Sequence, residues 1–134
     1  MIPASSNPRR EPIFDALGVR LTGWEPGRAE FTLDIEARHL NFAGRLHGGI
    51  IAMLLDVAGG YAAMPSIAAD ETSLVATISL AINYLAGAPG GSIRSTGRRT
   101  GGGKQIIFAT CELYAQDGAL LATAQGSFRV SRSG

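Results

Sequence analysis

The sequence has few of the residues on which several common classes of protein depend. It holds one cysteine in 134 residues, so neither an intramolecular disulfide nor a site built on several thiolates is possible. Charged residues make up 17%, below the roughly 25% of an average soluble chain. A single free cysteine fits a reducing compartment, and we expect a cytoplasmic protein.

Three further classes lack their usual signals. The net charge is +1, and the twelve basic residues are spread along the chain rather than clustered, so we expect no nucleic-acid partner. The polar start of the chain is not followed by the apolar core of a secretory signal. The longest apolar stretch, Gly49–Met64, is short for a membrane span and carries Asp56 near its centre, so we expect no membrane partner.

Hydrophobic residues, at 46%, and 18 glycines are what the sequence has in excess. A chain of this length is the size of one domain and buries roughly two-thirds of its surface on folding. Residues 1–12 hold three prolines and two serines without periodicity, which predicts a flexible N-terminal arm. We expect residues 13–131 to form a single domain.

The hydrophobic pattern predicts a helical turn at Pro12–Leu17, two strands, one long helix and four more strands. The helix, Gly48–Met64, is apolar on nearly all sides, which is typical of a buried helix. Expected turns are Glu25–Gly27 and Asp117–Gly118. The expected strands are Val19–Trp24, Ala29–Glu36, Leu74–Leu85, Ser92–Arg98, Gln105–Ala115 and Leu120–Val130. Because strands and helices do not alternate, we predict an α+β fold with a five- to six-stranded antiparallel sheet.

Two details of this pattern bear on packing. Gly59 and Gly60 are unfavourable inside a helix by about 1 kcal/mol each, which predicts close contact with a neighbouring element. In the strand 74–85, simple alternation puts the apolar residues on one face and Thr77, Ser79 and Asn83 on the other. One helix covers only one face of the sheet, and the low surface charge favours an oligomer.

The segment Asn41–Gly49, which runs directly into the long helix, holds the strongest candidate residues. Gly48 lies at the helix N-terminus, where an unpaired backbone N–H can bind a carbonyl oxygen, as in an oxyanion hole. Asp56 lies about 12 Å further along the helix, too far to serve the same carbonyl within one chain. If the helices of two protomers pack antiparallel, Asp56 of one faces Gly48 of the other, and the site is composite.

Each candidate also has a structural interpretation. Asp56 could cap a neighbouring loop, although an apolar helix offers a carboxylate few partners, which favours function. His47 could fix the loop by a hydrogen bond, and Asn41 could be a turn residue. The basic loop Arg98–Lys104 could face phosphates or be a flexible hairpin. His39, His47 and Asp56 match no usual zinc spacing, so we expect no metal.

The spacing of Asn41, His47-Gly48-Gly49 and Asp56 resembles the acyl-CoA thioesterases of the hotdog fold, in the 4-hydroxybenzoyl-CoA and phenylacetate-pathway (PaaI-like) branch. Later segments resemble the same family: Ala81–Leu85, Gly103-Lys104, Asp117-Gly118 and Phe128–Val130. The resemblance implies a hotdog fold, an acyl-CoA substrate, no cofactor beyond the coenzyme A of the substrate, and a homodimer with composite sites that pairs into a dimer of dimers.

The resemblance also implies roles for single residues. Asp56 corresponds to the nucleophile or general base, and Gly48, with Gly49 beside it, to the backbone donor for the thioester carbonyl. Asn41 corresponds to a residue that holds water or the thioester, and His47 to a histidine that supports the turn. Thr77 corresponds to a hydroxyl that orients water from the partner subunit. Further implied substrate contacts are Arg98, Arg99 and Lys104 for phosphates. Apart from the resemblance, we expect an acyl pocket lined by Tyr84 with Phe42, Met53, Leu54 and Tyr61.

The expected reaction is hydrolysis of an aryl- or medium-chain acyl-CoA to the free acid and coenzyme A. Two alternatives stay open: a non-catalytic acyl-CoA or acyl-carrier binding protein, and a hotdog hydratase or dehydratase that uses a histidine for proton transfer. The residues do not distinguish aryl from medium-chain acyl groups, nucleophile from base, or dimer from tetramer.

Overall fold

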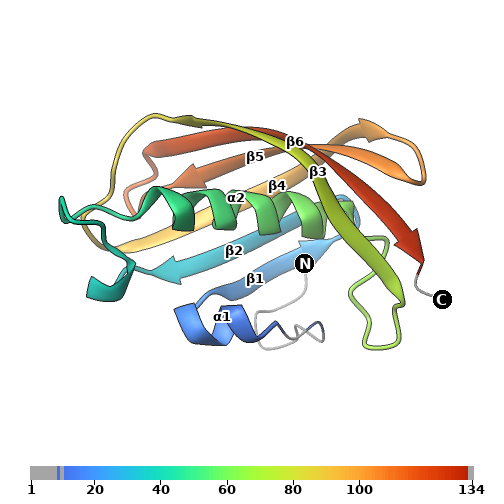
Figure 1. Ribbon diagram of the computed structural model, residues 1–134, viewed down its shortest axis with the longest axis horizontal. Helices are drawn as coiled ribbons and strands as arrows, with labels where there is room; N and C mark the ends of the chain where they lie inside the picture. The colour runs from blue at the N-terminus through green and yellow to red at the C-terminus, as the bar shows by residue number, and fades with distance from the viewer. Residues whose placement is uncertain (1–8, 10, 133–134) are drawn as a thin grey trace.

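Alternating apolar side chains build one antiparallel sheet, and the long apolar helix lies against its inner face (Figure 1). The computed structural model describes residue 9 and residues 11–132. The elements are α1 (Pro12–Leu17), β1 (Arg20–Glu25), β2 (Arg28–Asp34), the short turn of helix Ala37–His39, α2 (Gly48–Ala63), β3 (Ser73–Tyr84), β4 (Ser92–Gly102), β5 (Ile106–Tyr114) and β6 (Leu120–Arg132). The strand order is β1-β2-β4-β5-β6-β3 with antiparallel neighbours, so the predicted α+β class and hotdog architecture are confirmed.

Part of the expected N-terminal arm, residues 1–8 and residue 10, lies outside the described residues. Pro12 begins α1, where its missing N–H leaves no helical hydrogen bond unmade. Within the described part of the chain, no helix is long and apolar enough to span a membrane.

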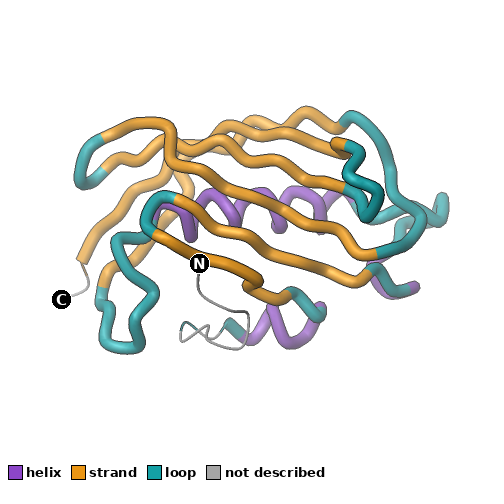
Figure 2. Tube along the Cα trace, turned by 180° about the vertical axis from the view of Figure 1, so that it is seen from behind, coloured by secondary structure: helices purple, strands orange, loops and turns teal. Residues whose placement is uncertain are grey.

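One side of α2 is buried in the core and the other is partly exposed. Ile51, Leu54, Leu55 and Ala58 lie on the buried side, and Figure 2 shows the helix covered by the sheet from behind. Burying each large aliphatic side chain stabilises the fold by about 1.5–3 kcal/mol. The opposite side, which carries Asp56, is half-buried in the single chain. Asp56 is therefore accessible from outside the core.

Glycines let the middle of α2 approach the sheet closely. A Cβ on Gly97 of β4 would lie 2.1 Å from the carbonyl oxygen of Ala58, and one on Gly59 would lie 2.6 Å from Phe128. The predicted close approach at Gly59 is confirmed. It is wrong for Gly60, whose added Cβ would be in ordinary contact at 3.9 Å. At Gly97 the backbone of the helix packs directly on the backbone of the sheet, and this contact sets the distance between them.

A β-bulge overturns the predicted alternation in β3. The pairing of β3 with β6 shifts between Thr77 and Ser79, so Ile78 is an inserted residue. Before the bulge Val75 and Thr77 share the helix side of the strand, and after it Leu80 does. The face expected for Thr77 is wrong, because an inserted residue reverses the alternation of side chains between the two faces of the strand. The inserted residue, Ile78, is 56% exposed. The bulge brings the Thr77 hydroxyl to the helix.

The expected loop Arg98–Lys104 is mostly strand. β4 continues to Gly102 and pairs with β5 through a second bulge between Arg99 and Gly101. Gly102 has φ 108°, and a Cβ there would lie 2.3 Å from the carbonyl oxygen of Ile106, so a glycine is required at the start of the tight turn. The predicted turn at Asp117–Gly118 is confirmed, and the one predicted at Glu25–Gly27 is found at Pro26–Gly27, directly after β1. The remaining ends of helices and strands lie within two residues of the prediction.

Candidate functional site

Asp56 is the single charged residue of α2, and its carboxylate meets a hydroxyl of the edge strand. Thr77 Oγ1 donates a hydrogen bond of 2.6 Å to Asp56 Oδ1. The resemblance implied a hydroxyl acting from the partner subunit, whereas in the structure the hydroxyl binds the carboxylate of its own chain. The second carboxylate oxygen has no hydrogen bond to a described residue and is available to water or substrate.

Cys111 lies beneath this pair on β5. It is buried, and a Cβ on Gly59 would lie 2.9 Å from its sulfur. Burial, together with the nearby charges of Asp56 and Glu112, raises the pKa of Cys111 to about 12. The thiol is therefore protonated at neutral pH, and it does not serve as a nucleophile.

The start of α2 is fixed by His47. Its Nδ1 accepts the backbone N–H of Gly49 at 3.0 Å, which is a helix N-cap interaction, and its own N–H donates to the carbonyl of His39 at 2.9 Å. The structural interpretation of His47 is thus observed directly. The Gly49 N–H, which we expected to contact substrate, is occupied within the chain.

The Gly48 N–H, in contrast, has no hydrogen-bond acceptor among the described residues. The Tyr84 ring lies against Gly48, and the Tyr84 hydroxyl donates to the Gly48 carbonyl oxygen at 3.0 Å. The Tyr84 bond holds the Gly48–Gly49 peptide, and the N–H of the preceding His47–Gly48 peptide stays free. Gly48 is therefore the backbone group best placed to bind a carbonyl oxygen.

Asn41 organises the loop before the helix. Its Oδ1 accepts from the backbone N–H groups of Ala43 at 2.9 Å and Arg45 at 3.1 Å, so its side chain forms the turn, as one of the two interpretations had it. His39, which is fully buried, anchors the preceding turn through Nδ1 to the Glu36 N–H and Nε2 to the Leu17 carbonyl oxygen.

A hollow of about 350 Å³ lies at the start of α2, and we call it the helix-start hollow. Asn41, Arg45, Gly48 and Tyr84 line it together with Leu46, Ile51, Leu85, Ala86 and Gly87. Two residues expected at the acyl group, Leu54 and Tyr61, are buried in the core instead, so that expectation is wrong for them. Phe42 is fully exposed, and Met53 packs at the edge of the core.

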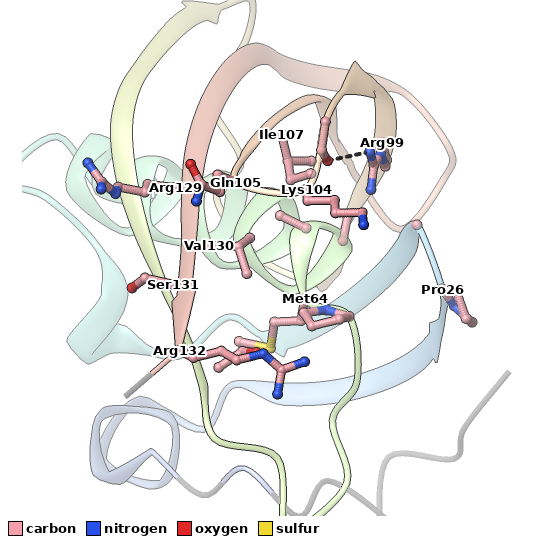
Figure 3. Close-up of a pocket in the computed structure, with 16 residues that line it drawn as sticks. Pro26, Met64, Arg99, Lys104, Gln105, Ile107, Arg129, Val130, Ser131 and Arg132 are labelled. Atoms are coloured by element: carbon pink, nitrogen blue, oxygen red, sulfur yellow. Dashed lines mark hydrogen bonds between the residues drawn. The ribbon is translucent and has the colours of Figure 1, made fainter. Parts of the chain in front are cut away.

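A larger hollow, of about 770 Å³, lies at the other end of α2, and we call it the helix-end hollow (Figure 3). Arg99, Lys104 and Arg132 contribute cations, and Met64 and Val130 contribute apolar surface. Arg99 Nη2 donates to the Gly103 carbonyl at 2.9 Å, which fixes its guanidinium beside the turn. In Figure 3 the Arg129 side chain points away from Lys104 and Arg132. The hollow offers an anionic ligand three positive groups, from β4, from β6 and from the turn between β4 and β5.

Arg98 does not join this hollow. It lies with Arg28 and Arg94 in a shallow depression of about 210 Å³ on the outer face of the sheet, because neighbouring residues of a strand point to opposite faces. The expected cluster of Arg98, Arg99 and Lys104 is therefore divided between two faces.

The described residues contain no group of three or more histidine, cysteine or acidic side chains that could hold a metal ion. The structure brings together Asp56 with Thr77, and separately Asn41, His47, Gly48 and Tyr84. It does not join these two groups within one chain. Arg132 was missed because the last strand extends two residues beyond its predicted end, and Arg45 was missed because a loop has no periodicity to single it out.

Comparison with known proteins agrees with this geometry. Residues 43–122, more than half of the chain, match the family model described as thioesterase superfamily. The medium/long-chain acyl-CoA thioesterase YigI of Salmonella typhimurium is 30% identical over 132 residues, covering 89% of this chain and 85% of that protein.

Solved structures show the same fold. A thioesterase family protein from Silicibacter pomeroyi has a TM-score of 0.83 at 28% identity, covering 97% of this chain and 99% of that one. The PaaI protein of the Escherichia coli phenylacetic acid degradation operon has a TM-score of 0.81 at 24% identity, covering 93% and 86%. The chain therefore belongs to the thioesterase superfamily and is a thioester hydrolase.

Proposed function

We propose that the protein hydrolyses an acyl-CoA thioester to the free acid and coenzyme A, with an aryl or medium-chain acyl group, in the manner of the 4-hydroxybenzoyl-CoA and PaaI-like branch of the family. The observation that carries the proposal is the Asp56 carboxylate, held by Thr77 at 2.6 Å on an otherwise uncharged helix and accessible from outside. A half-buried carboxylate with one hydroxyl partner on an otherwise apolar helix is costly to desolvate, so its presence favours a chemical role.

In the proposed mechanism the thioester carbonyl oxygen binds the Gly48 N–H, where the positive end of the α2 dipole stabilises developing negative charge. Asp56 removes a proton from water as the water oxygen adds to the carbonyl carbon. Alternatively, a carboxylate oxygen adds itself and water then hydrolyses the mixed anhydride. In both routes the carbon–sulfur bond breaks, and the coenzyme A thiolate leaves and takes up a proton. Thr77 holds the other carboxylate oxygen in place.

The substitution Asp56→Asn tests the proposal. We expect Asp56→Asn to lower kcat by about 10²–10⁴-fold. The assay measures release of the free coenzyme A thiol from a panel of aryl-, short- and medium-chain acyl-CoAs. Asp70→Asn, in the exposed loop before β3, is the matched control and should keep full activity. Near-wild-type turnover by Asp56→Asn would overturn the assignment of Asp56. Flat traces from the wild-type protein across the panel would favour a non-catalytic binding protein.

A second pair of variants tests the Gly48 N–H. Proline suits the first position of a helix, and His47, with φ −63° and ψ 134°, has the backbone conformation that precedes a proline. Gly48→Pro therefore removes the N–H with little cost to the helix. Gly48→Ala keeps the N–H, and its Cβ would lie 3.6 Å from Tyr84. We expect the proline variant to lose about 10²–10³-fold in kcat and the alanine variant to retain most activity.

We propose that the active site is composite and needs a homodimer. Gly48 and Asp56 lie about 12 Å apart along α2, which is too far for one carbonyl group. β3 is an edge strand with exposed Leu74 and Ile78, and the exposed side of α2 lies beside it, so both are available to a second copy. We extend this proposal to a dimer of dimers in the cytoplasm.

Mixing two inactive variants tests the composite site. If Gly48 of one protomer acts with Asp56 of the other, a heterodimer of Gly48→Pro and Asp56→Ala has one intact site, and an equimolar mixture should recover about a quarter of wild-type activity. Each variant alone should stay inactive. No recovery after subunit exchange, verified by mass spectrometry of the intact dimer, would place both residues in one protomer's site.

A further inference from the structure

Arg45 has a fixed position at the helix-start hollow and no role in the mechanism above. Its backbone is held on both sides by Asn41: the Arg45 N–H donates to Asn41 Oδ1 at 3.1 Å, and the Arg45 carbonyl accepts the Asn41 N–H at 2.7 Å. The side chain therefore starts from a defined point at the rim of the hollow, two residues before the helix N-cap.

The stem of the Arg45 side chain is also placed. It lies on Gly87, where an added Cβ would be 3.4–3.5 Å from the Cβ, Cγ and Cδ atoms of Arg45. Its guanidinium forms no hydrogen bond or ion pair with a described residue. Arg20, Arg28 and Arg94, in contrast, each lie within 4 Å of a carboxylate. Arg45 thus brings an uncompensated positive charge to a hollow that contains the free Gly48 N–H.

The rest of the hollow is largely apolar. Leu46, Ile51 and Leu85 line it beside the Tyr84 ring, and its volume of about 350 Å³ suits a small ligand. An acyl group whose carbonyl oxygen binds Gly48 would lie on this apolar surface, in the same hollow that Arg45 lines. A carboxylate matches a guanidinium in charge and in its two parallel hydrogen bonds.

We infer that Arg45 determines acyl specificity by binding a carboxylate at the far end of the acyl group, so that the preferred substrates are coenzyme A esters of medium-chain dicarboxylic acids. The inference rests on the proposed thioesterase function. Coenzyme A phosphates are the other anionic groups of such a substrate, but the helix-end hollow supplies three cations for them.

Two esters of equal chain length test the inference: adipyl-CoA, which ends in a carboxylate, and hexanoyl-CoA, which ends in a methyl group. The wild type should have the higher kcat/KM for adipyl-CoA. Arg45→Gln keeps part of the stem and a polar end but removes the charge, and it should lower kcat/KM for adipyl-CoA about tenfold while hexanoyl-CoA changes by less than about twofold. Arg45→Lys should lie between them, because it keeps the charge and loses the paired hydrogen bonds.

Arg28→Gln on the outer face is the matched control and should leave both substrates unchanged. Arg45→Gln could instead lower kcat/KM equally for both coenzyme A esters and leave it unchanged for the matching pantetheine thioesters. That result would assign Arg45 to the coenzyme A phosphates and overturn the inference. A wild-type enzyme that hydrolyses hexanoyl-CoA without preferring adipyl-CoA would overturn the inference alone. Absence of turnover with every ester would overturn the proposed function as well.

Discussion

Thr77 and Asp56, 21 residues apart in the chain, are joined by a hydrogen bond of 2.6 Å from Oγ1 to Oδ1. The bond depends on the bulge at Ile78, because regular alternation that kept Leu80 on the helix side would turn Thr77 to the outer face. It fixes the rotamer of the carboxylate and leaves one oxygen free.

Replacing Thr77 separates this positioning effect from bulk. Thr77→Val keeps the shape and removes the donor, and we expect kcat to fall about tenfold or more, because hydrogen bonds to charged groups contribute about 1.5–3 kcal/mol. Thr77→Ser keeps the hydroxyl and should recover most of the rate. Steady-state kinetics with one acyl-CoA measures both, and equal kcat for the valine variant and the wild type would contradict the positioning role.

Removing the cap of α2 should weaken both the helix and the site. His47→Ala loses the acceptor for the Gly49 N–H, and we expect a loss of about 1 kcal/mol in the free energy of unfolding. His47→Asn supplies another capping oxygen and should restore stability and most of the activity, although it cannot transfer a proton. Urea denaturation and kcat provide the readouts. An asparagine variant that is stable but inactive would assign His47 to the chemistry instead.

Adding a methyl group at Gly97 should destabilise the fold more than adding one elsewhere in the same strand. The Cβ of Gly97→Ala would lie 2.1 Å from the Ala58 carbonyl oxygen, and overpacking of this kind costs about 1–3 kcal/mol or more. Gly101→Ala is the matched control, since its Cβ would lie 3.9 Å from Phe108. Equal denaturation midpoints for the two variants would show that the helix can move away from the sheet at no cost.

The buried thiol of Cys111 should be unreactive in the folded protein and should make stability depend on alkaline pH. Burial raises the pKa of Cys111 to about 12 from 9.0, so the folded state holds the proton more tightly than the unfolded state. The stabilisation is complete below pH 9 and is lost as the pH rises through 12. The free energy of unfolding should therefore fall over this range.

Cys111→Ala provides the control, because its free energy of unfolding should fall less between pH 9 and pH 12. A disulfide reagent at pH 8 should label the wild type only after denaturant is added. Rapid labelling of the native protein would contradict the burial of the thiol.

The cations of the helix-end hollow should act on the nucleotide end of the substrate. Arg99→Ala and Lys104→Ala should raise KM for an acyl-CoA, and the effect should weaken at high salt. Neither should change kcat/KM for the matching pantetheine thioester, which lacks the nucleotide. Arg94→Ala, on the outer face, provides the control. An equal loss with both substrates would place these residues at the acyl group or in the fold.

The sequence was sufficient for the order of the elements because long, strongly patterned segments carry that information. Gly48 to Ala63 is apolar over four turns, and Asp117-Gly118 is a strong hairpin signal, so both were placed to within a residue. The bulges at Ile78 and Thr100 could not be predicted, because a bulge follows from the pairing partner across the sheet.

The candidate site divides in the same way. In the sequence, Asp56 stands out as the single charge on an apolar helix, and Gly48 stands out as the glycine at which that helix begins. Both residues are accessible in the structure. The sequence did not predict contacts between segments that are far apart in the chain. Whether Thr77 faces the helix, or Arg98 shares a face with Arg99, depends on strand phase, and a single inserted residue changes it.

The backbone contact of Ala58 with Gly97 bears on how the enzyme can adapt to new substrates. It lies half a turn of helix from Asp56, so the distance of the carboxylate from the sheet is set by main-chain atoms. Changing the size of core side chains would leave that distance almost constant. Selection for larger or smaller acyl groups would therefore act through the Asn41–Leu46 loop and the β3 edge, while the reacting end of the site keeps its dimensions.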